Sequence, residues 1–298
     1  LKMPECQLCI DYGKKIPVPD IDVQVAGSAP NVAIGIAKMK KTSAVYSQMG
    51  KDIFHPIAIE FLQKNNVETK YVKALAGSDS GFAAVLNFKG ESTQLVKQNG
   101  KAYHLPKRLP KTKWIHVSEL GHGYEKLYKE LIAAKKEKRF QISFNPGAVQ
   151  INERKKDLFR LIKITDVLFL NRAEAETLTD VIEKTEIHRL MSELFKLGPK
   201  YIVVTDGKNG AYAYNGEQLD FAPMFPGARV EATGAGDAFT TGFLGAIMHE
   251  KKHDCGLRWG SVNAASVVHS IGPTKGLLSH HQIKKRLREH PNYKTKEL

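Results

Sequence analysis

The chain has 298 residues, of which 42% are hydrophobic and 26% charged, a composition typical of folded globular proteins and not of disordered or fibrous ones. Its three cysteines are too few for a disulfide framework, and no apolar stretch approaches the ~18 residues that span a bilayer. We therefore expect a cytoplasmic protein with no membrane partner. The net charge of +14 leaves two hypotheses, a nucleic-acid partner or a lysine-rich solvated surface, and we favour the second.

Most of the excess charge lies in two blocks. Residues 101–140 carry 11 basic and 4 acidic side chains, and residues 275–298 carry 7 and 2. Within the first block, residues 124–138 place Tyr124, Leu127 and Leu131 on one face and lysines on the other, which predicts an amphipathic helix. Much of this block is then an ordinary solvent-facing surface.

Short apolar runs alternate with amphipathic stretches along most of the chain. Five runs of four or five residues predict buried strands, namely residues 44–47, 114–118, 141–145, 167–171 and 202–205. Strands that alternate with helices indicate an α/β fold with a mostly parallel sheet covered on both faces.

One region interrupts this alternation. Residues 81–97 predict a hairpin with its turn at Lys89-Gly90, and the alternating residues 21–26 predict a further strand. We expect these strands to form a small lid over a cleft. The expected domains are a catalytic unit of residues 28–70 and 102–298 and a discontinuous lid of residues 1–27 and 71–101.

Four of the predicted strands end on polar residues, namely Ser118, Asn145, Asn171 and Thr205 with Asp206. Ligands of open α/β sheets bind outside the carboxyl ends of the strands. We therefore expect these residues to line a polar cleft.

A glycine-rich segment, Gly234-Ala235-Gly236-Asp237, comes directly before an apolar helical run at residues 238–248. The first N–H groups of a helix lack intrahelical partners, and together with the helix dipole they favour an anion such as phosphate. Asp237 has two interpretations, a first-turn carboxylate that stabilises the dipole or a general base for phosphoryl transfer.

Two other patterns are weak. The segment 249–253 (HEKKH) matches the spacing of zinc proteases, but it lies at the polar end of the predicted helix, so we expect a cationic helix end there. Cys6 and Cys9 have no second pair nearby and do not indicate a metal site. The segment Gly234–Gly236 lacks the third glycine of the dinucleotide fingerprint, and no Walker A pattern occurs.

Residues 231–243 (EATGAGDAFTTGF) closely resemble the C-terminal signature of the ribokinase-like (PfkB-type) sugar and nucleoside kinases. Further segments are similar to motifs of that family and follow in its order, namely residues 27–33 (GSAPNVA), 171–174 (NRAE), 205–210 (TDGKNG), 263–265 and 272–276. The resemblance implies a ribokinase-like three-layer, doubly wound, mostly parallel sheet with a small β-sheet lid, through which relatives often dimerise.

The resemblance also implies roles for individual residues. Asp237 would be the general base, with the backbone of Gly234, Ala235 and Gly236 as the anion hole. Two residues near the lid, Gly27 and Asn31, would bind the acceptor. The residues expected along ATP and Mg2+ are Asn171, Glu174, Thr205, Gly207, Gly210 and Asn263, with Glu174 reaching the metal through water.

Two departures from the family pattern stand out. Glu231-Ala232 replaces the usual Asp-Thr, at a position that helps to hold a monovalent cation in many relatives, so Glu231 is a candidate K+ residue. The opening strand with its acidic sugar ligand has no counterpart, Asp11 and Asp22 being the nearest candidates. We therefore expect a further segment upstream of Leu1.

The resulting hypothesis is an ATP-dependent kinase that phosphorylates a primary hydroxyl of a small sugar, such as ribose, fructose or a keto-deoxy sugar acid. A nucleoside kinase of the adenosine or cytidine type is the alternative within the family. A non-catalytic regulatory or nucleic-acid-binding protein is the alternative from another class.

Overall fold

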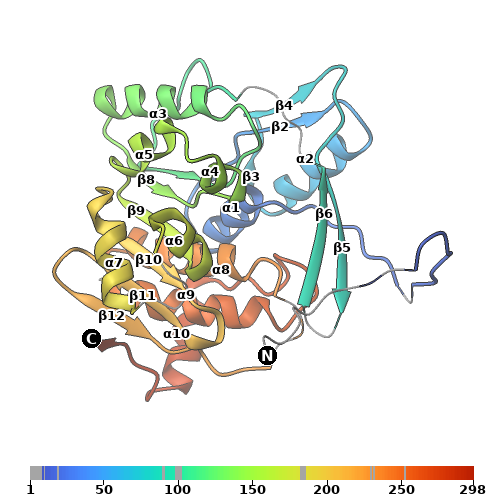
Figure 1. Ribbon diagram of the computed structural model, residues 1–298. Coiled ribbons are helices and arrows are strands. Elements are labelled where there is room, and N and C mark those ends of the chain that lie inside the picture. Colours follow the sequence, from blue (N-terminus) through green and yellow to red (C-terminus); the bar gives the residue numbers. More distant parts are fainter. Residues whose placement is uncertain are drawn as a thin grey trace.

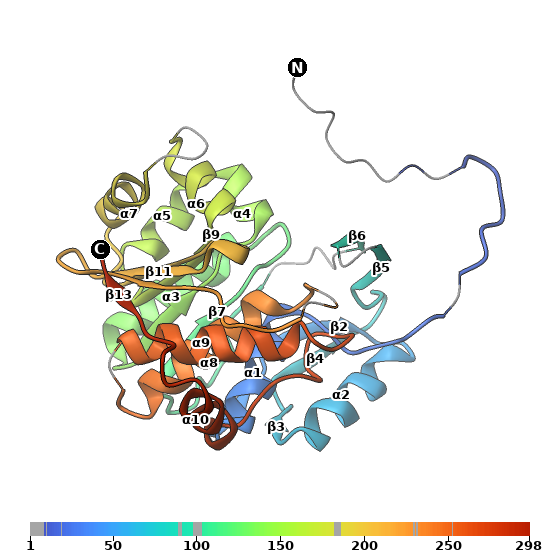
Figure 2. The same cartoon turned by 90° about the horizontal axis from the view of Figure 1, so that it is seen from below.

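The computed structural model describes residues 9, 11–18, 20–88, 91–97, 103–181, 186–228, 230, 232–251 and 253–298. Its centre is a seven-stranded sheet with helices on both faces, so the predicted α/β architecture is confirmed (Figures 1 and 2). None of the described helices is long and apolar enough to cross a membrane.

The central sheet has the order β13-β12-β11-β10-β9-β8-β7. Neighbouring strands are parallel from β7 to β10 and antiparallel from β10 to β13. The strands are β7 (Trp114–Val117), β8 (Gln141–Phe144), β9 (Val167–Asn171), β10 (Ile202–Thr205), β11 (Ala211–Tyr214), β12 (Leu219–Ala222) and β13 (Lys296–Glu297). The four strands β7 to β10 lie where the sequence predicted them, and β7 and β8 each end one residue earlier than expected.

Each inner strand buries both of its faces, which explains its continuous apolar sequence. In β9, Leu168 and Leu170 pack into one core cluster, whereas Val167 and Phe169 pack into another. The first cluster is covered by α3 (Glu125–Glu137), α4 (Ala148–Glu153), α5 (Lys156–Ile162), α6 (Arg172–Thr179) and α7 (Ile187–Lys196). The second is covered by α1 (Ser28–Lys38), α8 (Ala235–Met248) and α9 (His253–Val267), and α10 (His280–Glu289) packs outside α9 (Figure 2).

The amino-terminal third forms smaller units beside this sheet. Short parallel pairs join β1 (Ser43–Ala44) with β3 (Val67–Glu68) and β2 (Ser47–Gly50) with β4 (Val72–Leu75), around α2 (Phe54–Lys64). The single strand predicted at residues 44–47 was wrong. These residues instead belong to two strands, β1 and β2, which pair with different partners. Val45 lies between the two strands, where it is buried and its N–H donates to the Glu68 carbonyl.

The predicted hairpin is confirmed as β5 (Phe82–Phe88) and β6 (Glu91–Lys97), which stand apart from the central sheet (Figure 1). Its predicted turn, Lys89-Gly90, lies outside the described residues. The strand predicted at residues 21–26 was wrong, since residues 20–27 form no strand and Ile21 and Val23 are largely exposed. Alternation of apolar and polar residues makes a strand only where another edge supplies hydrogen-bond partners.

The contact between α1 and α8 depends on a glycine. A Cβ at Gly35 would lie 2.3 Å from Thr241 Cγ2, so a side chain at this position would push the helices apart. One turn earlier on both helices, Asn31 on α1 meets Asp237 on α8. Residues four apart in sequence lie on the same face of a helix. The contact between Gly35 and Thr241 therefore also brings together Asn31 and Asp237, two predicted site residues.

We predict that Gly35→Ala destabilises the protein by about 1–3 kcal/mol, because the added methyl overpacks a buried helix contact. Thr241→Ala in the same chain removes two of the three nearest atoms and should recover part of the loss. Chemical denaturation of the two single variants and the double variant measures this coupling. Losses that simply add would contradict the proposed contact.

Candidate active site

The side chains that follow the parallel strands gather at one edge of the sheet, as predicted. Asn171 and Thr205 are register partners at the ends of β9 and β10. Asn145 follows β8 and donates from Nδ2 to the Phe169 carbonyl over 3.0 Å. Ser118 follows β7 and is buried. These residues form one polar border because parallel strands end at the same edge.

Helix α8 begins beside this border, at the predicted glycine segment. Gly234 is its N-cap with φ of 78°, and a Cβ there would clash with Pro273 at 2.5 Å. The Ala235 N–H already donates to the Ala232 carbonyl over 3.2 Å. Gly236, in contrast, is exposed, and a Cβ there would have no atom within 4 Å. Of the three glycine-segment residues, Gly236 has the open approach that an incoming anion needs.

Asp237 is the partly exposed acid of the first turn of α8. Its Oδ2 accepts a 2.7 Å hydrogen bond from Asn31 Nδ2, and Asn31 is 4% exposed. The pKa of Asp237 is raised to about 6, because the effects of burial and of the negative charge of Glu119 outweigh the opposing hydrogen bonds from Asn31 and Ser28. A carboxyl with this pKa is largely ionised at pH 7 and still basic enough to take a proton.

Glu119 was not predicted from the sequence. It directly follows Ser118 and lies within 3.5 Å of the Ser28 hydroxyl, which donates to its Oε1. Its charge raises the pKa of both Asp237 and Glu174, so the three carboxylates share one electrostatic environment. The only available signal was its place immediately after a predicted strand, since its partners are distant in the sequence.

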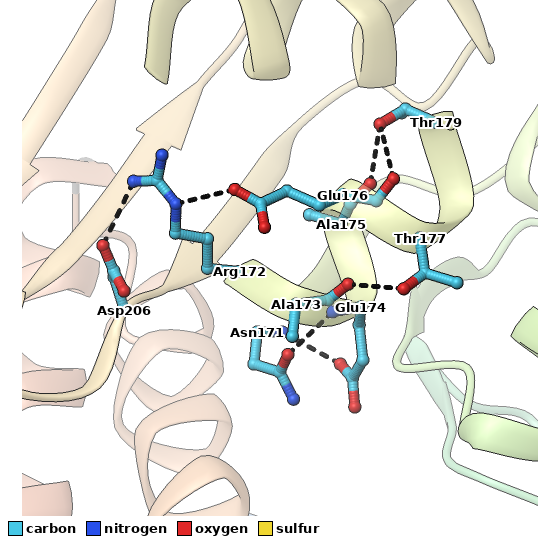
Figure 3. Close-up of polar contacts among 9 residues, drawn as sticks. All are labelled: Asn171, Arg172, Ala173, Glu174, Ala175, Glu176, Thr177, Thr179 and Asp206. Carbon is cyan, nitrogen blue, oxygen red and sulfur yellow. Dashed lines mark hydrogen bonds and ion pairs between the residues drawn. The ribbon is translucent and has the colours of Figure 1, made fainter. Parts of the chain in front are cut away.

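Asn171 and Glu174 form a reciprocal capping box at the start of α6 (Figure 3). Asn171 Oδ1 accepts from the Glu174 N–H over 2.8 Å, and Glu174 Oε2 accepts from the Asn171 N–H over 2.9 Å. Burial, followed by the charge of Glu119, raises the pKa of Glu174, while the bond to Asn171 lowers it. Local capping therefore explains the spacing of these two residues. The repulsion between Glu174 and Glu119 additionally favours a cation nearby.

This donor set fits Mg2+. The metal usually binds to one or two carboxylates, to phosphate oxygens and to water, without a complete protein cage. Glu174 and Glu119 supply two neighbouring carboxylates. Among the described residues, no group of three or more His, Cys, Asp or Glu residues could hold a metal, so phosphate and water would complete the coordination.

The loop after β10 is anchored to the start of α6. Arg172 bonds Glu176 through Nε over 3.0 Å and Asp206 through a terminal nitrogen over 3.2 Å (Figure 3). Gly207 opens the short helix η1 (Gly207–Asn209) with φ of 52°, and no atom lies within 4 Å of a Cβ built there. Gly210 has φ of 102° and packs on the Ala222 carbonyl. Gly207 thus faces open space, whereas Gly210 shapes the β10–β11 hairpin.

The remaining predicted residues lie in different settings. Gly27 is the N-cap of α1 with φ of 123°. Asn263 has no exposed surface, because its Nδ2 donates to the Ala238 carbonyl over 2.7 Å and its Oδ1 accepts from the Leu278 N–H over 2.9 Å. It therefore influences a ligand only through the segments that it joins. Glu231, the candidate K+ residue, and Cys6 lie outside the described residues.

The two histidines of the HEKKH segment lie on different elements. Helix α8 ends at Met248, and His249 Nε2 contacts the Met39 carbonyl at 2.9 Å. His253 begins α9 and stacks on Tyr201 with ring centroids 3.9 Å apart. The single helical face on which zinc proteases display both histidines is not present.

The sequence profile of the pfkB family carbohydrate kinases matches residues 5–279. The chain belongs to this family. Its members are sugar and nucleoside kinases, so the protein is a phosphotransferase that acts on a hydroxyl group.

Individual relatives of this pfkB family protein agree in fold and length. A nucleoside kinase of Methanocaldococcus jannaschii is 25% identical over 288 residues, covering 93% of this chain and 92% of that protein. Arabidopsis thaliana ribokinase, solved with ribose and ATP, has a TM-score of 0.80 at 21% identity, covering 93% of this chain and 92% of its own. An E. coli protein provisionally assigned as ribokinase II, solved with ATP and Mg2+, has a TM-score of 0.78 at 18% identity, covering 94% of each chain. The ribokinase-like fold is confirmed.

The raised pKa of Asp237 predicts that Asp237→Asn stabilises the unliganded protein at pH 8. The folded-state pKa of about 6 lies above the ordinary value of 3.8, so the folded state loses free energy relative to the unfolded state as the pH rises from about 4 to 6, and the whole loss is present above pH 6. Allowing for solvent screening of a partly exposed group, we expect a gain of about 1–2 kcal/mol. This gain should shrink as the pH falls from 6 to 4.

Thermal unfolding of both proteins between pH 4 and 8 measures this difference. The alternative interpretation, a carboxylate that only stabilises the helix dipole, predicts the opposite sign, a loss of about 0.3–1 kcal/mol in the variant. Asp254→Asn, in the first turn of α9, is the matched control for the dipole effect.

Proposed function

We propose that the protein transfers the γ-phosphoryl group of ATP, in the presence of Mg2+, to a primary hydroxyl of a small sugar such as ribose, fructose or a keto-deoxy sugar acid. The observation that carries the proposal is the Asn31–Asp237 pair at the glycine entrance of α8. It combines a base of suitable pKa with an open anion site one residue away.

Asp237 removes the proton from the acceptor hydroxyl as that oxygen attacks the phosphorus. Asn31 orients the carboxylate through its Nδ2 group, and its Oδ1, which is buried without a hydrogen-bond partner among the described residues, accepts from the sugar. Gly27 and Ser28 begin α1 on the same side, and Glu119 adds a further acceptor there. Because all of these groups form hydrogen bonds and no aromatic side chain is among them, they support a polyhydroxyl acceptor.

The start of α8 receives the negative charge that develops during transfer. An anion can approach the backbone at Gly236. Gly234 adopts the left-handed N-cap conformation, and Ala235 is the first residue of the helix. Preorganised donors of this kind contribute a factor of about 10²–10³ per donor in rate.

Glu174, together with Glu119, holds the divalent cation, and Asn171 and Thr205 border the phosphates at the sheet edge. Bound Mg2+ neutralises phosphate charge. Gly207 leaves room for the nucleotide, while Gly210 and Asn263 hold the segments that shape its site. The hairpin β5–β6 covers the acceptor and excludes water, with residues 28–70 and 102–298 as the catalytic unit.

Two finer points remain predictions. Activation by K+ through Glu231 is predicted from the sequence alone. The expected homodimer through the lid is supported by the exposed Phe82, Leu95 and Val96 of the hairpin, since an isolated two-stranded sheet with apolar faces needs a cover.

Asp237→Asn should lower phosphoryl transfer by at least about 10³-fold while nucleotide binding persists, because the base is lost and the anion site remains. The assay uses Mg·ATP with ribose, fructose, 2-keto-3-deoxygluconate, adenosine and cytidine, together with calorimetry for ATP binding. Asp254→Asn should turn over normally as the matched control.

Near-normal turnover of Asp237→Asn would exclude the mechanism. Turnover of adenosine or cytidine by the wild type, without turnover of a sugar, would exclude the sugar assignment and retain the kinase.

A further inference from the structure

Four basic side chains line one cavity at α9 and α10, apart from the residues of the candidate active site. These two helices lie next to each other (Figure 2). The cavity has a volume of about 440 Å³ and is lined by Arg258, His281, Lys284, Leu287 and Arg288. His281, Lys284 and Arg288 follow a spacing of three and then four residues, so they share one face of α10. Arg258 faces them from α9.

These cations have no counter-charge within the part of the chain that the structure describes. None of the four forms an ion pair there, and Arg258 Nε is buried without an acceptor. Lys285, the residue next to Lys284, points elsewhere and reaches Glu289 at 3.9 Å. A buried guanidinium donor is normally paired, so its free donor indicates that a ligand or water completes the site.

The neighbouring His280 reports on the potential around this cavity. Its pKa is lowered first by burial and then by the positive charges of His281, His249, Lys284 and Lys41. No carboxylate is among the causes. The positive groups near the start of α10 therefore act on His280 in the same direction.

We propose that this cavity, defined by Arg258, His281, Lys284 and Arg288, binds a compact anion that contains a di- or triphosphate group. The permanent positive charges of Arg258, Lys284 and Arg288 complement the negative charge of such an anion, and the His281 ring can donate a hydrogen bond to it. The volume lies within the range of about 300–1,000 Å³ that is usual for small-molecule sites. Leu287 gives the cavity an apolar floor, against which a nucleoside attached to the phosphates could pack.

This inference gives part of the second basic block, residues 275–298, a specific partner. A nucleic acid is less well matched, because the four cations converge on one cavity instead of following a continuous stripe. A small anion is therefore the occupant that the geometry favours.

The test titrates inorganic triphosphate into the full-length protein and follows the ring proton of His281 by NMR, with His281→Gln used to assign the signal. This reporter separates the cavity from the catalytic cleft, which also attracts phosphate. We expect a saturable shift, about tenfold weaker binding in Lys284→Gln and in Arg258→Gln, and unchanged binding in Lys285→Gln. Because Lys284 is exposed, its variant should retain the wild-type unfolding temperature.

A second titration with ATP distinguishes the two sources of the phosphate group, since tighter binding of ATP identifies a nucleotide and tighter binding of triphosphate identifies the free anion. The proposal is overturned if the His281 signal does not move below about 5 mM of either probe. Equal weakening by Lys284→Gln and Lys285→Gln also overturns it, because that result indicates diffuse attraction. If an oligonucleotide binds and both variants weaken its binding equally, this face is a nucleic-acid-binding surface and not a small-anion site.

Discussion

The close approach of α1 and α8 is the contact on which the candidate active site depends. Gly35 leaves room for Thr241, and one turn earlier the same approach brings the buried Asn31 to Asp237. A larger residue at position 35 would clash with Thr241 and weaken the contact between α1 and α8. The packing of Gly35 against Thr241 thus supports the hydrogen bond that orients the Asp237 carboxylate.

The unliganded candidate site holds like charges close together. Glu119 raises the pKa of both Asp237 and Glu174, and burial raises both further. Such an arrangement reduces the stability of the folded protein, and it becomes favourable when a cation and a substrate hydroxyl are bound. The pfkB family fold tolerates this arrangement because the large double-sided core of the sheet supplies the stability.

The parts of the fold that could be predicted from the sequence follow local rules. Strands β7 to β10 are continuous apolar runs that end in polar residues, and the start of α8 carries its own glycine signal. Residues 21–26 show the limit of such rules. Their apolar and polar residues alternate as in a strand, but they form no strand because no neighbouring strand pairs with them. The sequence did not indicate Glu119, nor that Asn263 is buried, for a related reason. Glu119 contacts Ser28, which is far away in the chain. Asn263 likewise joins two other segments, at Ala238 and Leu278.

The most direct test of the central claim is the titration of the Asp237 carboxyl by 13C NMR in the unliganded protein. The structure predicts a midpoint near pH 6 in the wild type. Glu119→Gln should lower the midpoint by removing a like charge, and Asn31→Leu should raise it by removing a hydrogen bond to the ionised form. A midpoint near pH 4 that neither substitution moves would contradict the account.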